Sequence, residues 1–98
     1  MNLKEEGRES YVTGNEYQKL AMRTCVSPVP WHNEAVMNHG VFGLCAEAGE
    51  VASIFQKYYQ GHGHPLNKED HLKKELGDCL WMIAEICTGL GFDMDDVM

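Results

Sequence analysis

The sequence predicts an all-α protein in which an antiparallel helical hairpin forms part of a four-helix-type bundle that oligomerisation completes. Apolar residues recur every three or four positions over two long segments, which is helical spacing. No segment alternates with period two for long enough to suggest a strand. A short loop with glycine and proline joins the two segments, so the helices should run antiparallel and expose apolar faces that need further partners.

Length and charge narrow the classes of protein. A chain of 98 residues forms one small domain and buries roughly 60–65% of its unfolded surface, so association is expected. The formal net charge of −7 argues against nucleic-acid backbones and anionic membranes as partners, because both require a basic surface. A small anionic ligand remains compatible with this charge if metal ions lie between ligand and protein.

Cysteine usage and the absence of long apolar runs indicate a cytoplasmic protein. The four cysteines contain no C-x-x-C pair, and we expect buried free thiols in a reducing compartment. The N-terminus has no apolar core of the signal-peptide kind. No apolar run approaches the ~18 residues of a transmembrane helix. The cysteines are Cys25, Cys45, Cys79 and Cys87.

The chain is expected to consist of a polar N-terminal segment, residues 1–12, followed by a single helical domain, residues 13–98. "TGNE", residues 13–16, has the form of a capping box, which predicts a helix over 14–25. "SPVP" stops that helix, because two prolines with one residue between them cannot continue it. The residues expected to face inward are Tyr17, Leu20, Ala21 and Met22.

The second helix is predicted over residues 34–60. Asn33 is a suitable N-cap, and Gly61 and Gly63 end the helix ahead of Pro65. Its expected apolar stripe is Met37, Val41, Leu44, Ala48, Val51, Phe55 and Tyr58 or Tyr59.

The third helix is predicted to begin within "NKED", with Asn67 and Asp70 as caps, and to end at Leu90 before Gly91. Another helix should begin at Asp93. The expected stripe of the third helix is Leu72, Leu76, Cys79, Ile83, Ile86 or Cys87, and Leu90.

Two acidic pairs stand out because each encloses a glycine inside a helix. "EAGE" (Glu47, Glu50) and "ELGD" (Glu75, Asp78) both follow the pattern Leu-x-x-Glu-x-Gly-acid. At about 100° per residue, the acids of each pair lie about 60° and 120° from the leucine that precedes them. Two helices of a hairpin in the same phase can therefore bring all four carboxylates to one seam.

Four convergent carboxylates repel one another unless a cation neutralises them. Oxygen-only ligands suit Mg²⁺, or Mn²⁺, and Mg²⁺ commonly bridges a few carboxylates to substrate phosphates. This chemistry favours phosphate transfer or hydrolysis, with a metal lowering the pKa of a bound water. Gly49 and Gly77 are expected to allow close packing or backbone flexing behind the acids. Lys57 lies on the acidic side and would meet a phosphate or pair with a nearby acid.

Three alternatives remain open at this stage. Acid pairs at i, i+3 also occur on solvated helix faces. A ferritin-like di-iron site would need Glu-x-x-His on two helices, but neither His39 nor His71 follows a glutamate by three positions. The third alternative is a non-catalytic oligomeric helical module that binds a nucleotide or a protein.

The segments "GLCAEAGEV", "QKYYQGH" and "ELGDCLWMIA" resemble the MazG-like nucleotide pyrophosphohydrolases of the all-α NTP pyrophosphatase superfamily, over about residues 16–98. The hallmark is Glu-x-x-Glu followed by Glu-x-x-Asp, here separated by 24 residues (75 − 50 − 1). The resemblance implies hydrolysis of an NTP or dNTP to a monophosphate and pyrophosphate. It also implies Mg²⁺ on Glu47, Glu50, Glu75 and Asp78, and a homodimer or homotetramer whose sites draw on more than one subunit.

The sequence departs from the pattern of these relatives in two ways. Many relatives have two adjacent glutamates at the start of the first motif, where this chain has Ala46. Relatives also continue with a helix bearing Asn and Lys and a basic Arg-Tyr-Pro segment, whereas this chain ends at Met98. We therefore expect a truncated C-terminal helix and less support for a bound nucleotide.

Overall fold

The computed structural model describes residues 12–25 and 33–98, and within them every regular element is a helix. The all-α class is therefore confirmed. The expected polar segment, apart from Val12, and the proline stop lie outside the described residues. The elements are α1 (Gly14–Met22), α2 (Glu34–Tyr59), the 3-10 helix η1 (Pro65–Lys68), α3 (Glu69–Leu90) and α4 (Met94–Val97).

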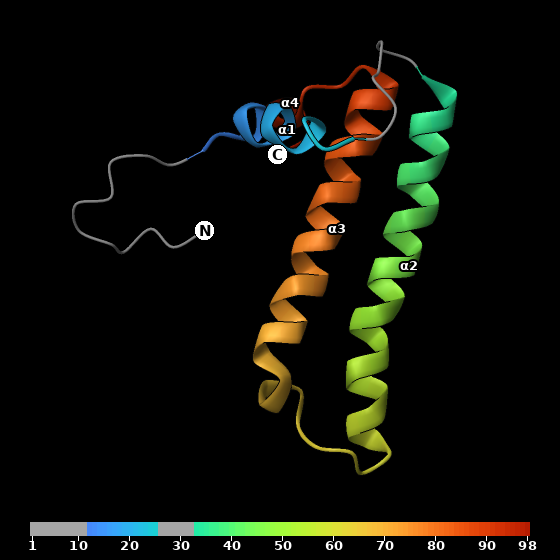
Figure 1. Cartoon of the computed structure of the whole chain (residues 1–98), viewed down its shortest axis with the longest axis vertical. Helices are drawn as coiled ribbons and strands as arrows, with labels where there is room; N and C mark the ends of the chain where they lie inside the picture. Colours follow the sequence, from blue (N-terminus) through green and yellow to red (C-terminus); the bar gives the residue numbers. More distant parts are fainter. Residues whose placement is uncertain (1–11, 26–32) are drawn as a thin grey trace, which may run out of the picture.

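The two long helices α2 and α3 lie side by side as an antiparallel hairpin (Figure 1). Helix α1 lies across the C-terminal part of α3, on the side away from α2, and α4 packs beside α1. Among the described elements, α1 and α4 thus cover one end of the hairpin, and along the rest of its length α2 and α3 pack against each other. Within the described residues, no helix is both long and apolar enough to cross a membrane.

Two predicted helix starts are confirmed by their hydrogen bonds. The Glu16 amide donates to Thr13 Oγ1 over 3.0 Å, and the Thr13 amide donates to Glu16 Oε1 over 2.7 Å. The Val36 amide donates to Asn33 Oδ1 over 3.1 Å. Helix α1 nevertheless ends at Met22, before the predicted residue 25, and Leu20 is exposed rather than buried.

The predicted caps of the third helix are wrong. His64 Nδ1 accepts from the Leu66 amide over 3.1 Å and starts η1. Helix α3 then continues directly from η1, and its cap residue Lys68 makes no side-chain cap bond. Pro65 explains the difference, because its fixed φ and missing N–H suit the first position of a helical turn. The end of α3 is confirmed, since Gly91 adopts a left-handed φ of 80°.

The predicted apolar stripe of α2 is partly wrong in phase, whereas in the stripe of α3 Cys87 is buried and Ile83 packs against the core as expected. Val41, Phe55 and Leu76 are exposed by 41%, 45% and 49%, although the spacing assigned them to the core. The side of α2 that faces α3 instead carries Gly40, whose added Cβ would lie 2.7 Å from Ile86 Cγ1. Helix α3 packs against this glycine because a missing side chain permits the shortest interaxial distance, which turns the predicted stripe partly outward.

Close approach occurs at different glycines from those predicted. A Cβ on Gly89 would lie 2.8 Å from the Met37 amide nitrogen. A Cβ on Gly49 or Gly77 would meet nothing within 4 Å. Within the described chain, the expected close packing behind the two acidic motifs is therefore not made.

The core forms where α1 and α4 meet α3. Its buried members are Ala21, Ala84, Cys87 and Met94. Gln18, also buried, donates to Thr88 Oγ1 over 3.0 Å and accepts from the Met94 amide over 2.9 Å. No disulfide joins the four cysteines, but Cys45 is exposed, so the expectation of burial is wrong for that thiol.

Candidate metal centre

Three carboxylates converge between the two helices of the hairpin. Glu47 on α2 and Glu75 and Asp78 on α3 each offer one oxygen, and these oxygens lie within 4.8 Å of one another. Glu47 follows Gly40 by seven residues, so it returns to within about 20° of the side that faces α3. The orientation of α2 that exposes Val41 and Phe55 is thus also the orientation that turns Glu47 toward α3.

Glu75 is the buried member of the group, with a residue exposure of 6%. Its Oε2 accepts a hydrogen bond from His71 Nε2 over 3.0 Å, one helical turn earlier. Its Oε1 is buried and has no hydrogen-bond partner. Buried carboxylate oxygens are normally paired, because an unpaired one loses its hydration without compensation. The position therefore favours a cation or a proton beside Oε1.

The Glu47 carboxyl responds to this crowding. A hydrogen bond to the Glu75 carboxylate raises the pKa of Glu47, and burial and the charges of Asp78 and Glu75 add to the effect, while Lys74 opposes it. A hydrogen bond between two carboxyl groups requires a proton on one of them. When Glu47 is protonated, it can donate to the Glu75 carboxylate. When both carboxyl groups are ionised, neither can donate, and Glu75 Oε1 is then the oxygen without a hydrogen-bond partner.

Lys74 is the lysine that pairs with two of these acids in the described part of the chain. Its Nζ lies 3.0 Å from Asp78 Oδ2 and 4.0 Å from Glu75 Oε2. The hydrogen bond and charge of Asp78 raise the pKa of Lys74, so it stays protonated. Sequence reasoning missed both Lys74 and His71, although each stands four residues before an acid of the motif, a spacing at which helical side chains meet.

The other expected site residues lie apart from this group. Glu50 is exposed and its carboxylate is not among the three that converge. It lies about 60° around α2 from Glu47, toward one open side of the hairpin. Lys57 is exposed, seven residues beyond Glu50 and on the same side. The structure thus brings together three of the four expected ligands.

A second polar group lies further along the hairpin and was not expected. Glu85 on α3 is only 3% exposed, and its Oε1 lies 2.7 Å from His39 Nδ1 on α2. The Cys25 thiol donates to Glu85 Oε2 over 3.3 Å. The signal available in the sequence was a lone acid within the apolar run "WMIAEIC". Its partners could not be named, because they lie 46 and 60 residues earlier in the chain.

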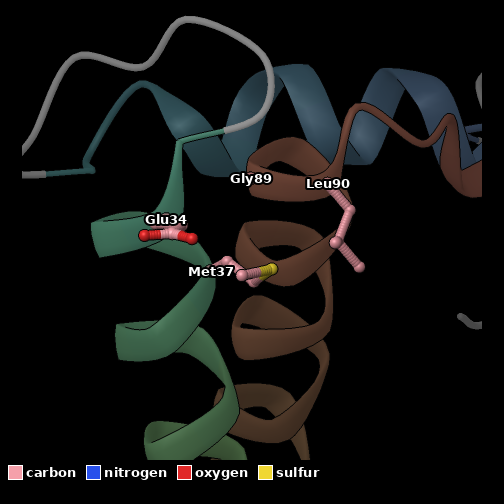
Figure 2. A pocket seen from close by; sticks show the side chains of 4 residues that line it. All are labelled: Glu34, Met37, Gly89 and Leu90. Atoms are coloured by element: carbon pink, nitrogen blue, oxygen red, sulfur yellow. The ribbon is translucent and has the colours of Figure 1, made fainter.

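A pocket of about 250 Å³ lies at the end of the hairpin where α2 begins and α3 ends. Figure 2 shows Met37 extending from α2 toward α3, with Glu34 close by and Leu90 on the α3 side. Met37 precedes Glu47 by ten residues, which places the pocket about 15 Å along the helix from the carboxylates. The pocket is therefore separate from the acidic group.

The donor set fits a hard divalent cation. Three carboxylate oxygens, one of them unpaired, match the preference of Mg²⁺ for a few carboxylates plus water and phosphate oxygens. There is no imidazole or thiolate among the three residues, which disfavours a zinc site. The fold and this group define a class: an all-α protein with a carboxylate cluster held between two antiparallel helices.

The chain belongs to the MazG nucleotide pyrophosphohydrolase domain family, whose sequence profile matches residues 41–98. It is also similar to the "Gene 37 protein" of Mycobacterium phage L5, with 30% identity over 78 residues. That alignment covers 76% of this chain and 68% of the phage protein. No solved structure matches the chain.

Proposed function

We propose that this protein hydrolyses a nucleoside triphosphate, NTP or dNTP, to a nucleoside monophosphate and pyrophosphate in a Mg²⁺-dependent reaction. Membership of the MazG family supports nucleotide pyrophosphohydrolase chemistry in general. One observation supports the proposed location of the metal site. Glu75 Oε1 is buried and has no hydrogen-bond partner, and the Glu75 carboxylate is grouped with the oxygens of Glu47 and Asp78.

The proposal assigns a separate role to each residue of the site. Glu47, Glu75 and Asp78 would hold the cation, and Glu50 would join them from the exposed side when substrate is present. When bound, Mg²⁺ would supply charge neutralisation for the phosphate chain and a water of lowered pKa. His71 fixes Glu75 through Oε2, which leaves Oε1 available. In this step water adds to the α-phosphorus, the bond from that phosphorus to the oxygen bridging to the β-phosphorus breaks, pyrophosphate leaves, and the proton that the water loses passes to solvent.

Lys74 and Lys57 are the cations proposed to meet the anionic substrate. Lys74 pairs with Asp78 in the metal-free arrangement and becomes available to a phosphate oxygen once a cation takes over that carboxylate. Lys57 lies exposed on the side of Glu50. Mn²⁺ would serve in place of Mg²⁺, since both accept an oxygen-only ligand set.

Self-association is part of the proposal. Val41, Ala48 and Phe55 are exposed on the side of α2 opposite Glu50, and Leu76 and Leu80 are exposed on α3. We call these five residues the apolar side of the hairpin. A second copy of the chain is the proposed occupant, because a hairpin covered on one helix only leaves this surface in water. The result would be a homodimer or homotetramer working in the cytoplasm.

The test is a pyrophosphate-release assay over a panel of ribo- and deoxyribonucleotides with Mg²⁺, comparing wild type with Glu75→Gln and Glu69→Gln. Glu75→Gln keeps the shape of the side chain but removes the charge, and we expect activity to fall to background. Glu69→Gln is the matched control, an exposed acid on the same helix paired with Lys73 over 2.7 Å, and should retain activity. Wild-type protein without turnover on any nucleotide would instead favour a non-catalytic helical module.

A further inference from the structure

His39 and Glu85 form a carboxylate–imidazole pair that the metal site does not use. Glu85 is buried and holds His39 Nδ1 over 2.7 Å, whereas the His39 side chain is 64% exposed. An ionised carboxylate only accepts hydrogen bonds, so Nδ1 carries the proton of the neutral ring. Nε2 is then an acceptor on the ring edge away from Glu85. The structure thus orients one exposed acceptor with a buried group.

The pair lies on the same side of the hairpin as the acidic motifs. On α2, Glu50 follows His39 by 11 residues (50 − 39), which differs from whole turns by only about 20°. On α3, Glu85 follows Asp78 by seven residues (85 − 78), again about 20°. His39, Glu50, Asp78 and Glu85 therefore share one face, which we call the acidic side.

The separation along this side fits a nucleotide. Glu47 follows His39 by eight residues (47 − 39) and Glu85 follows Asp78 by seven, so the pair lies about 10–12 Å along the helices from the carboxylates. An extended nucleoside triphosphate places its base at a comparable distance from the phosphates that a metal binds. With the phosphates at Glu47, Glu75 and Asp78, the nucleoside reaches toward His39 when it lies along the hairpin in this direction.

We infer that His39, oriented by Glu85, is a specificity-determining residue that accepts a hydrogen bond from the nucleoside part of the substrate. This inference rests on the proposed function. The shared chemistry is an N–H of the base or an O–H of the sugar, either of which an imidazole nitrogen accepts. Cys25 completes the arrangement by donating to the second oxygen of Glu85, so the carboxylate cannot turn away from His39 without losing that bond.

The experiment compares His39→Asn with His39→Gln. The asparagine amide nitrogen takes the place of Nδ1 and still donates to Glu85, but nothing remains at the position of Nε2. The glutamine amide reaches the position of Nε2 and offers an acceptor there. A purely structural tether predicts that Asn is tolerated; a role in substrate binding predicts that Asn is damaging and Gln rescues. Circular dichroism and thermal unfolding check that both variants fold.

Steady-state kinetics supply the readout. For the preferred nucleotide we expect His39→Asn to raise KM roughly tenfold, the loss of one hydrogen bond, with kcat within about twofold and with selectivity among nucleotides reduced. Sugar triphosphates without a base and 3′-deoxynucleotides separate the two donors. A penalty that disappears without the base assigns a base N–H, and one that persists there but disappears with the 3′-deoxy sugar assigns a sugar hydroxyl.

Three results would overturn the inference. The first is unchanged KM and selectivity in His39→Asn. The second is the same penalty on inorganic triphosphate, which has no nucleoside. The third is a wild-type protein that hydrolyses no nucleotide, which also removes the proposed function. An active wild type that loses activity in Glu75→Gln, together with a silent His39→Asn, would retain the proposed function and reject the role of His39 alone.

Discussion

At the residue scale, the chemistry of the site depends on how Glu47 is protonated. Folding raises its pKa, chiefly through the hydrogen bond to Glu75, so the folded state binds this proton more tightly than the unfolded state. The stabilisation is therefore complete at a pH below the unfolded pKa and is lost as pH rises through the folded pKa. In metal-free protein, this group makes folding less favourable at neutral pH than in acid.

Glu47→Gln tests this coupling. The amide removes the charge, so in EDTA the variant should be more stable than wild type at neutral pH, and the difference should vanish as the pH falls toward about 4. Thermal unfolding across this pH range measures the effect. Because Lys73 lowers the pKa of Glu69 in both proteins, the opposite slope from Glu69 cancels in the comparison. Parallel pH profiles for the two proteins would contradict the shared proton.

Thermal unfolding of wild type and Glu47→Gln can also be compared with and without Mg²⁺. A cation that binds the folded state alone would take the place of the proton beside Glu75, and the stabilisation would rise with the logarithm of its concentration once that concentration exceeds Kd. Wild type should therefore gain stability from Mg²⁺ at neutral pH, while Glu47→Gln gains less. Equal gains in both proteins would remove Glu47 from the ligand set.

Sequence reasoning named the residues of the acidic group more readily than their surroundings. Glu47, Glu75 and Asp78 were identifiable because their motif spacing encodes their place around each helix. The partners of Glu85 were not, since His39 and Cys25 reach it only through the packing of α1, α2 and α3. The position of Glu50 in the exposed part of α2 likewise depends on which side of α2 faces α3, a fact that no single-helix pattern contains.

At the element scale, the hairpin is specified by glycines whose roles differ. Gly40→Ala would place a Cβ 2.7 Å from Ile86 Cγ1 and 3.1 Å from the Ile86 amide nitrogen, and backbone at that distance cannot turn aside. We expect a loss of about 1–3 kcal/mol in the free energy of unfolding, as for other overpacked contacts. Denaturant unfolding at equilibrium measures it.

Gly49→Ala is the matched control in the same helix. A Cβ there meets nothing within 4 Å, so only helix propensity changes, and the variant should gain up to about 1 kcal/mol. A loss of stability at Gly49 comparable to that at Gly40 would show that the outer face of α2 is packed after all. A tolerated Gly40→Ala would mean that α2 and α3 are further apart than the structure has them.

Helix ends were more predictable than helix faces. Thr13, Asn33 and Gly91 act locally, through hydrogen bonds or backbone conformations within a few residues, so their patterns sufficed. The apolar stripe of α2 was only partly right, because an amphipathic pattern on a broadly apolar helix does not reveal which part of its surface a partner covers. Gly40 and Gly89 decided that choice, and glycine contributes nothing to a hydrophobic pattern.

At the scale of the whole molecule, the described part of the hairpin leaves several large apolar side chains in water. Phe55, Leu76 and Leu80 are exposed by 45%, 49% and 52%, whereas the core cluster is confined to the end of α3 that α1 and α4 cover. The acidic side and the apolar side lie on opposite flanks of the same two helices. A second copy can therefore cover the apolar side and leave the carboxylates open to substrate.

Charge substitutions on the apolar side should dissociate the assembly. Phe55→Glu and Leu80→Glu each place a carboxylate where a second copy is proposed to pack, and burying it unpaired would cost several kcal/mol. We expect sedimentation velocity to show wild type as a dimer or tetramer and these variants shifted toward the monomer. Lys57→Glu, an exposed charge reversal on the acidic side of α2, is the control and should sediment as wild type.

A monomeric wild type at micromolar concentration would reject the proposed partner, and an unshifted Phe55→Glu assembly would place the interface elsewhere. Because the acids lie on the opposite flank, dissociated variants that still fold should retain Mg²⁺-dependent stabilisation, which separates loss of assembly from loss of the metal site.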